Sequence, residues 1–394
     1  MSVEIRIPSL LKIGGGAFSE AGAVLAQLGC RRPLIVTDPF LREQGLAERL
    51  RKQVEDAGIR AEIFYETVAD PTSAVVDAGV RVFREGRHDS LVSAGGGSPI
   101  DTAKAMGMLA ANGGRVRDYK VPRPIPLAGP PHVAIPTTAG TGSEVTRFTV
   151  VTDSETGEKM LIAGGVLVPT AALVDYELTL SMPKRLTADT GTDSLTHAIE
   201  SYVSRKANAF SDGLALTAMR VIWRVLPVSV REPGNRAARE AMMLAATQAG
   251  MAFSNASVAL VHGMSRPLGA HFHVPHGLSN AMLLPAVTEF SASAAMDRYA
   301  DCARTMGVAT AEDATEKAVD LLVRALYQRN AELEVPTPKE YGIAEAEYFA
   351  KIPLMAEQAL ASGSPQNNPR VPTAKEIETI YRACWATCGG TNCR

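Results

Sequence analysis

The stretch SLVSAGGGSPIDTAK, residues 90–104, decides the fold of the first half of the chain. Its first five residues predict a buried strand, and Gly95, Gly96 and Gly97 follow without a break. Glycines lack the Cβ atom that would keep a phosphate away from the backbone. A strand that ends in such a loop predicts an α/β sheet with a nucleotide site at its carboxyl edge. The loop lacks the G-x-G-x-x-G spacing, so it does not match the standard Rossmann fingerprint.

The residues after the glycines predict the start of a helix. Ser98 is a suitable N-cap, Pro99 suits the first helical position, and Asp101 stands where a capping box places an acid. Free N–H groups at a helix start that faces the glycines would form a pyrophosphate site. The alternative is a glycine turn that only joins a strand to a helix.

Further strand and helix candidates alternate on both sides of this stretch. Strands are expected at residues 33–37, 61–65 and 132–136, and helices at roughly 45–57 and 75–85. This βαβ alternation predicts a doubly wound, mostly parallel, Rossmann-like sheet.

The alternation stops near Ser181–Pro183. The remaining sequence is rich in Ala, Leu, Met and Glu, and segments such as 210–226 and 236–252 predict buried or amphipathic helices. A chain of 394 residues is too long for one compact core. We therefore expect an α/β domain over residues 1–182 and an all-α domain over residues 183–394.

Two more features suit a dinucleotide. Thr137, Thr138 and Thr141 lie in a loop of hydroxyl and glycine residues after the strand at 132–136, where ribose and phosphate bind in open α/β sheets. Asp38 ends an earlier strand; its carboxylate can bind a ribose diol and would repel a 2′-phosphate, which favours NAD over NADP. The alternatives are a polar turn and a surface aspartate that caps a turn.

Histidines concentrate in the second half of the chain. Asp193 and His197 are four residues apart in a helical pattern, so both side chains would lie on one face. With His262 and His276 they give three imidazoles and one carboxylate, a set that suits Fe²⁺ or Zn²⁺. Two more histidines are rival ligands that the spacing does not exclude: His271 and His273.

Composition excludes several classes of function. The net charge is −2 and no dense basic run occurs, so a nucleic-acid partner is not expected. No signal peptide and no run of about 18 apolar residues is found, so we expect no membrane span and a cytoplasmic location. Five scattered cysteines do not suggest a disulfide framework. Cys384, Cys388 and Cys393 crowd the C-terminus without standard zinc spacing, and are interpreted as free thiols on a frayed end.

Several long motifs occur in one order between about residues 95 and 373. The chain carries GGGSPIDTAK, PTTAGTGSEVT, TADTGTDSLTHAIESYVS, AGMAFSNASVALVHGM, PLGAHFHVPHG and NNPRVPT, and in this it resembles the iron-containing alcohol dehydrogenases. The resemblance implies a dehydroquinate synthase-like architecture, with a dinucleotide-binding α/β domain, a helical domain and a cleft between them. It also implies a homodimer or a larger homo-oligomer.

The resemblance assigns roles to individual residues. It implies a pyrophosphate loop at Gly95–Ser98 with Asp101 close by, and Phe253 in the substrate pocket. Its nicotinamide and ribose contacts correspond to Thr137, Thr138, Thr141 and Lys159. Its metal ligands correspond to Asp193, His197, His262 and His276. The implied chemistry is hydride transfer between a nicotinamide and a primary alcohol or aldehyde, with the metal as a Lewis acid.

One position departs from the family pattern. Many members carry a histidine four residues after the third ligand, whereas this chain has Arg266, which cannot act as a base near neutral pH. In those members the resemblance assigns the histidine to relaying the proton of the alcohol. Here that proton would pass to His271, His273 or water, or the metal alone would lower the pKa of the alcohol. Our hypothesis is that Arg266 holds an anionic substrate group, such as the far carboxylate of 4-hydroxybutyrate. The alternative is an arginine on a phosphate or on a neighbouring acid.

The expected function is therefore an NAD-linked, Fe²⁺-dependent dehydrogenase of a small primary alcohol or aldehyde, with Zn²⁺ as the alternative metal. Glycerol dehydrogenase-like and maleylacetate reductase-like enzymes of the same fold are alternatives. A non-catalytic protein that binds a nucleotide or a metal is a further alternative from a different class.

Overall fold

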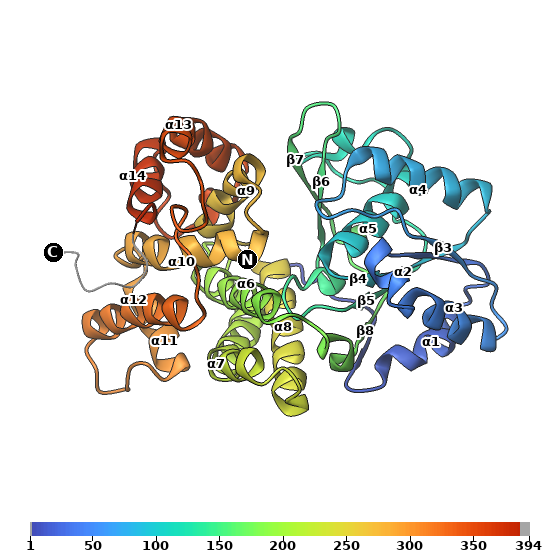
Figure 1. Cartoon of the computed structure of the whole chain (residues 1–394), viewed down its shortest axis with the longest axis horizontal. Coiled ribbons are helices and arrows are strands. Elements are labelled where there is room, and N and C mark those ends of the chain that lie inside the picture. The colour runs from blue at the N-terminus through green and yellow to red at the C-terminus, as the bar shows by residue number, and fades with distance from the viewer. Residues whose placement is uncertain (1, 387–394) are drawn as a thin grey trace. The chain divides into compact units, whose positions relative to one another are not determined.

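The computed structural model describes residues 2–386, and the chain forms two compact units (Figure 1). One unit comprises Ser2–Ser181 and contains the strands, and the other begins at Met182 and consists of helices. The predicted fold class, an α/β domain followed by an all-α domain, is confirmed.

The first unit is built on a six-stranded sheet in which all strands are parallel. The strands predicted near residues 33, 61, 90 and 132 are present, and two short neighbouring strands on one side of the sheet were not predicted. In spatial order the strands are β1 (Leu10–Ile13), β8 (Ala171–Val174), β5 (His132–Pro136), β4 (Ser90–Gly95), β2 (Pro33–Val36) and β3 (Glu62–Phe64).

Helices cover both faces of this sheet, because side chains alternate between its two faces. On β2, Ile35 packs in one core cluster with Leu25 and Leu50, whereas its neighbour Leu34 packs in the other with Met106. The first cluster is covered by α1 (Ala21–Gln27) and α3 (Leu46–Asp56), and the second by α4 (Ser73–Glu85) and α5 (Gly97–Asn112). The short helix α2 (Pro39–Glu43) follows β2.

An antiparallel hairpin stands apart from the main sheet and was not predicted. It consists of β6 (Phe148–Thr152) and β7 (Lys159–Ala163), in which buried and less buried residues alternate. Short 3-10 helices complete the connections: η1 (Ala17–Glu20), η2 (Val116–Tyr119), η3 (Ser143–Val145), η4 (Gly165–Leu167), η5 (Tyr176–Thr179) and, in the second unit, η6 (Ser364–Asn367).

The second unit has no strand in its described residues, 182–386. Helix α6 packs against α7, α8 and α10, and α10 also contacts α9 and α12. The predicted helices at 210–226 and 236–252 lie within α7 and α8 and are confirmed. The helices are α6 (Lys184–Val203), α7 (Ala209–Arg231), α8 (Arg236–Ala256), α9 (Leu260–Phe272), α10 (His276–Ala292), α11 (Met296–Met306), α12 (Thr315–Glu332), α13 (Glu345–Ala361) and α14 (Ala374–Cys384).

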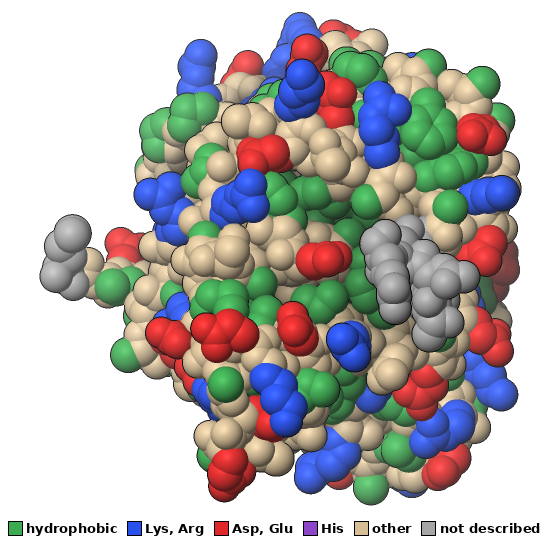
Figure 2. All heavy atoms as spheres, turned by 90° about the vertical axis from the view of Figure 1, so that its left-hand side faces the viewer, with side chains coloured by type: hydrophobic (Ala, Val, Ile, Leu, Met, Phe, Trp, Pro, Cys, Tyr) green, Lys and Arg blue, Asp and Glu red, His purple; other side chains and the backbone are tan. Residues whose placement is uncertain are grey.

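The helical unit bears on two expectations from the sequence, the lack of a membrane span and the frayed C-terminus. By length and composition α7 could cross a membrane, as core helices of soluble proteins also could, and it packs against α6 and α8. The expectation of a frayed end is wrong for Cys384, a buried free thiol in the last turn of α14. Cys388 and Cys393 lie outside the described residues. On the face in Figure 2, basic and acidic side chains are interspersed.

Candidate active site: a nucleotide loop and a metal centre

The glycine loop lies where the strand order of the sheet reverses. Strand β2 is followed by β3 on one side of the sheet, whereas β4, on the other side of β2, is followed by β5. Ligands in open α/β sheets bind at the carboxyl ends of strands at such a switch point. Asp38 follows β2, Gly95–Ser98 follow or end β4, and Thr137 and Thr138 follow β5. The predicted nucleotide-contacting residues therefore occupy three adjacent strand ends.

The helix after the glycines begins earlier than predicted. Helix α5 starts at Gly97, its N-cap is Gly96, and no side chain caps it. The expected capping by Ser98 and Asp101 is therefore wrong. Because glycine supplies no side-chain acceptor, the first N–H groups of α5 are left for a ligand, as a phosphate site requires.

The loop of threonines packs against the glycine loop. A Cβ on Gly97 would lie 3.1 Å from Thr141 Cγ2, and a Cβ on Gly96 would lie 3.5 Å from Thr138 Cγ2. Gly95 has φ +153°, and a Cβ there would lie 2.4 Å from Pro99 Cγ. Glycine at position 95 is thus required by the backbone, whereas Gly96 keeps an open approach to the helix start.

Asp101, predicted to lie close to the pyrophosphate, is engaged within its own unit. Its Oδ1 accepts a hydrogen bond from Ser143 Oγ, 2.5 Å away, and its Oδ2 accepts one from the Val150 N–H at 2.9 Å. Burial raises the pKa of Asp101, and the neighbouring Lys104 opposes that rise. These bonds tie α5 to η3 and β6, so Asp101 holds the elements around the glycine loop together.

Two other predicted cofactor residues have partners at the surface of the unit. Asp38 Oδ1 caps α2 by accepting a hydrogen bond from the Leu41 N–H at 2.8 Å, and burial raises the pKa of this carboxyl. Lys159, the first residue of β7, lies 2.9 Å from Asp70 Oδ1. A cap role for Asp38 and a ribose contact through its other oxygen are compatible.

The second unit brings the predicted metal ligands together. Asp193 and His197 come from consecutive turns of α6, His262 from the first turn of α9, and His276 is the first residue of α10. The Nε2 atoms of His197, His262 and His276 lie 3.7, 3.4 and 3.7 Å from Asp193 Oδ1. Asp193, His262 and His276 offer ligand atoms that all lie within 4.8 Å of one another. His276 is exposed and the other three are buried, so the centre is open on the His276 side.

The electrostatics of the centre favour a cation. Burial alone would raise the pKa of Asp193, but His197, His276 and His262 hold it well below its usual range, so the carboxylate is ionised. Close packing fixes the geometry, since a Cβ on Gly277 would lie 2.4 Å from the Asp189 carbonyl oxygen. The glycine therefore lets the start of α10 approach the backbone of α6.

Asn280, which the sequence analysis did not single out, tests whether the centre suits a metal. Its Nδ2 lies 2.6 Å from Asp193 Oδ1, 3.2 Å from His262 Nε2 and 3.3 Å from His276 Nε2. A positively polarised N–H₂ group thus stands among three acceptors that a divalent cation would bind. Its Oδ1 is buried with no hydrogen-bond partner among the described residues. The donor set and this unpaired amide oxygen both fit a metal ion at this point.

Glu200 is a second functional residue that the sequence analysis missed. Its Oε2 accepts a hydrogen bond from His262 Nδ1 at 2.7 Å, and its carboxylate also accepts from the Ala259 and Val261 N–H groups at 2.9 and 2.6 Å. A carboxylate on Nδ1 turns the Nε2 lone pair toward a metal and increases its basicity. Glu200 lies three residues after His197 on α6, but that spacing does not reveal its contact with His262, which lies 62 residues further along the chain.

The remaining candidates differ in how they relate to this centre. The Phe253 ring stacks on His197, with centroids 4.1 Å apart, so it forms an apolar wall beside a ligand. His271 lies nine residues after His262, on the opposite face of α9, and its Nε2 is 2.8 Å from Gln358 Oε1. His273 ends α9 in a left-handed conformation and is exposed. Neither rival histidine is in the group of Asp193, His262 and His276, nor does either have a recorded contact with Asp193, as His197 has.

Arg266 lies one turn after His262 on the same face of α9. Its Nη1 donates a hydrogen bond to Ser364 Oγ at 3.0 Å, and no carboxylate among residues 2–386 lies within ion-pair distance. Burial lowers its pKa to about 10, so the guanidinium stays protonated near neutral pH.

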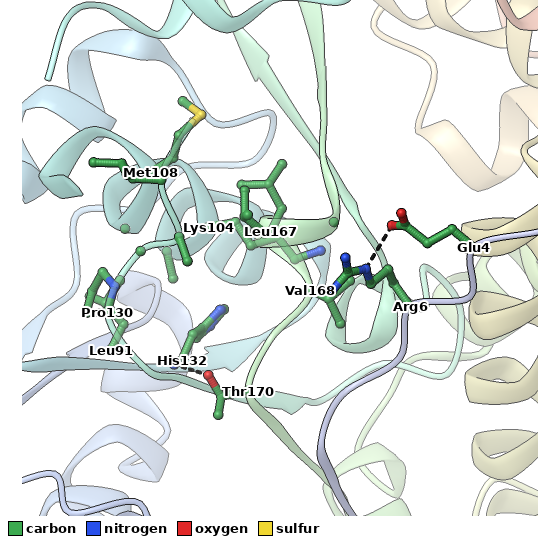
Figure 3. A pocket seen from close by; sticks show the side chains of 17 residues that line it. Glu4, Arg6, Leu91, Lys104, Met108, Pro130, His132, Leu167, Val168 and Thr170 are labelled. Atoms are coloured by element: carbon green, nitrogen blue, oxygen red, sulfur yellow. Dashed lines mark hydrogen bonds and ion pairs between the residues drawn. The ribbon is translucent and has the colours of Figure 1, made fainter. Parts of the chain in front are cut away.

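A separate cavity of about 380 Å³ lies in the first unit (Figure 3). Leu91 and His132 line it from the amino ends of β4 and β5, and Lys104, Met108 and Arg6 also face it. This position is the sheet edge opposite the glycine loop. The buried His132 is held by Ser93 Oγ, 2.7 Å from its Nε2. The cavity is thus distinct from the nucleotide loop.

Comparisons with known proteins agree with both parts of this site. A family model described as "Iron-containing alcohol dehydrogenase" matches residues 8–176, and one described as "Fe-containing alcohol dehydrogenase family, C-terminal" matches residues 187–385. The chain is 40% identical to an NAD-dependent methanol dehydrogenase of Bacillus methanolicus, over 95% of this chain and 98% of that protein. It is 38% identical to a 1,3-propanediol dehydrogenase of Citrobacter freundii, over 95% of this chain and 97% of that protein.

A solved structure of a 1,3-propanediol oxidoreductase superposes with a TM-score of 0.94 at 35% identity, over 98% of this chain and all of that one. Sequence and structure thus agree over nearly the whole length, across the glycine loop and all four predicted ligands. The chain belongs to the iron-containing alcohol dehydrogenase family.

Proposed function

We propose that this chain is a metal-dependent oxidoreductase that moves a hydride between NAD(H) and a small primary alcohol or aldehyde. The observation that carries the proposal is the group formed by Asp193, His262 and His276, with His197 stacked beside His262. The relatives described above are named for methanol and 1,3-propanediol, both short primary alcohols.

In this proposal the helical unit binds the metal and the α/β unit binds the cofactor. Asp193 and the three histidines would hold the cation, which supplies Lewis acidity for the alcohol oxygen when bound. Glu200 orients His262, and the Phe253 ring keeps one side of the centre apolar. The glycine loop and the start of α5 would hold the pyrophosphate of the cofactor, which accepts the hydride. The balanced reaction converts a primary alcohol and NAD⁺ to an aldehyde, NADH and a proton.

Two finer choices are part of the proposal. Asp38 at the end of β2 favours NAD over NADP, because its carboxylate would repel a 2′-phosphate. Three imidazoles and one carboxylate suit Fe²⁺ or Zn²⁺, and the matching iron-containing family favours Fe²⁺ with Zn²⁺ as the alternative.

The test begins with anaerobic purification and a measurement of metal per chain. The preparation is assayed with NAD and NADP against ethanol, 1,3-propanediol, 4-hydroxybutyrate and glycerol. About one metal per chain and NAD-linked turnover are expected, with both lost in Asp193→Ala and His276→Ala. Lys52→Met, an exposed change on α3, serves as the control. No metal and no turnover after addition of Fe²⁺ or Zn²⁺ would overturn the proposal.

A further inference from the structure

Arg266 has no carboxylate partner among residues 2–386. Its guanidinium has five N–H donors, and the structure records one protein acceptor for them, the neutral Ser364 hydroxyl. Two other partly buried arginines of the helical unit have carboxylate partners, Arg298 with Asp212 at 2.6 Å and Arg329 with Glu332 at 3.0 Å. The more deeply buried Arg239 has instead three neutral acceptors, Thr187 Oγ1 and the carbonyl oxygens of Pro233 and Met182, so Arg266 differs from all three in having a single acceptor among the described residues. Partial burial of a cation is unfavourable unless an anion compensates. The missing partner is therefore expected to come from outside the described chain.

The nearby Glu200 does not serve as that partner. It is the acid that influences Arg266 electrostatically, yet its carboxylate already accepts from His262 Nδ1 and from the Ala259 and Val261 N–H groups. The contact with Ser364 depends on close packing, because a Cβ on Gly263 would lie 2.7 Å from Pro365 Cγ in η6. Arg266 is thus held on one side by η6 while its remaining donors are left for a ligand.

The position of Arg266 fixes what such a ligand would look like. Four residues in an α-helix span about 6 Å along its axis, and side chains tilt toward the helix N-terminus. From this general geometry we expect the side chain of Arg266 to lean toward the turn that carries His262. A molecule with a hydroxyl or aldehyde oxygen at one end and a carboxylate at the other end of a short chain would reach both the metal centre and the Arg266 guanidinium. A planar guanidinium binds a carboxylate through two parallel hydrogen bonds.

We infer that Arg266 determines substrate specificity by binding the far carboxylate of a short ω-hydroxy acid, or of the corresponding aldehyde acid. The inference rests on the proposed function, since it assumes that the hydroxyl end is oxidised at the metal centre. It assigns to this chain an acidic substrate class of which 4-hydroxybutyrate is the simplest probe.

The test compares kcat/KM for 4-hydroxybutyrate with kcat/KM for 1,4-butanediol, a neutral alcohol of the same chain length. In Arg266→Gln the ratio of the two is expected to fall roughly 10- to 100-fold, the range of a charged hydrogen-bonded contact. Arg266→Lys, which keeps the charge but loses the planar fork, is expected to lose less. Arg220→Gln on α7 removes an exposed arginine and controls for net charge, and should leave the ratio unchanged.

A binding measurement separates this inference from the proposed function. Calorimetric titration of the metal-loaded protein with butyrate is expected to show binding that weakens by about tenfold or more in Arg266→Gln, because the same charged hydrogen-bonded contact is lost. Turnover of 1,4-butanediol with an unchanged ratio in Arg266→Gln would overturn the inference and leave the proposed function standing. A raised KM for NAD with an unchanged ratio would overturn it as well, and would assign Arg266 to a cofactor phosphate. Arg266-dependent butyrate binding without turnover of any alcohol would support the anion site and overturn the proposed function.

Discussion

At the scale of single residues, the candidate metal centre depends on groups that are not themselves predicted ligands. Glu200 holds His262 through Nδ1 and fixes the first turn of α9 through two backbone N–H groups. Asn280 stands among the ligand atoms, with its amide nitrogen where a cation would be. Ligand geometry is therefore set by hydrogen bonds that cross between α6, α9 and α10.

Glu200→Gln keeps the shape of this side chain and removes its charge. Metal affinity is expected to fall roughly 10- to 100-fold, because a neutral amide on Nδ1 makes His262 a poorer ligand. Competition with a chelator of known affinity measures the change. Glu240→Gln, an exposed position on α8, is the matched control. Equal affinity in the two variants would restrict Glu200 to a structural role at the start of α9.

These residues also show how far the sequence could lead. Asp193, His197, His262 and His276 were indicated by helical spacing and by motifs, and the structure places them together. Glu200 and Asn280 lie three and four residues after ligands on the same helices, but their roles depend on partners far along the chain. Only tertiary packing brings Glu200 to His262, so spacing alone could not assign it.

At the scale of elements, the sequence predicted the central strands of the sheet better than the short strands that complete it. The central strands β2, β4 and β5 were recognised because they are apolar runs bounded by turn residues. The four-residue strands β1 and β8 complete the sheet by pairing across about 160 residues, which no local pattern reveals. The hairpin of β6 and β7 was also missed, although buried and less buried residues alternate along both of its strands.

The start of α5 offers a way to separate folding from cofactor binding. Gly96→Ala would meet Thr138 only at ordinary contact distance, so the free energy of unfolding is expected to change by less than about 0.5 kcal/mol. NADH affinity, measured by fluorescence titration, should fall about tenfold or more, because the added methyl group occupies the approach to the phosphate loop.

Two matched glycine variants complete this experiment. Gly95→Ala is expected to lower the stability by about 1–3 kcal/mol, since a Cβ there clashes with Pro99 at a positive φ. Gly213→Ala on α7, where a Cβ meets open space, should leave NADH affinity unchanged and raise stability by about 0.5–1 kcal/mol, because alanine is the better helix former. Unchanged NADH affinity in Gly96→Ala would mean that the loop only joins a strand to a helix.

Lys104 links α5 to the hairpin and gives that link a pH dependence. Its Nζ donates to the carbonyl oxygens of Thr146 and Phe148, and burial lowers its pKa from 10.5 to about 8, against the opposing effects of Asp101 and Glu144. Between those two values the unfolded chain binds the proton and the folded chain does not. Stability therefore gains an upward slope with pH, at most about 1.4 kcal/mol per unit.

Urea unfolding from pH 8 to 10.5 measures this slope. Lys104→Met is expected to show a smaller increase, or a larger decrease, in stability over this range than the unmodified chain. Lys52→Met, which removes an exposed lysine, should follow the unmodified chain. Identical pH profiles for Lys104→Met and the unmodified chain would mean that Lys104 keeps an ordinary pKa in the fold.

At the scale of the whole molecule, the two ligands belong to different units of the chain. All four predicted metal ligands follow Met182, whereas the glycine loop and the threonine loop precede Ser181. A ligand stabilises the folded unit that contains its site, by about 2.7 kcal/mol when present at 100 times its dissociation constant. Metal and cofactor should therefore protect different sets of backbone amides.

Hydrogen exchange resolves this prediction by segment. Addition of Fe²⁺ or Zn²⁺ to the metal-free protein is expected to slow exchange in α6, α9 and α10, because the cation replaces the contacts that the Asn280 amide makes there. Addition of NADH should slow exchange around residues 95–98 and 137–141. In His276→Ala the metal effect should vanish while the NADH effect persists, since His276 belongs to the proposed metal-binding group and not to the glycine or threonine loops. Protection of the glycine loop by metal alone would show that the two sites are energetically coupled, and would contradict their independence.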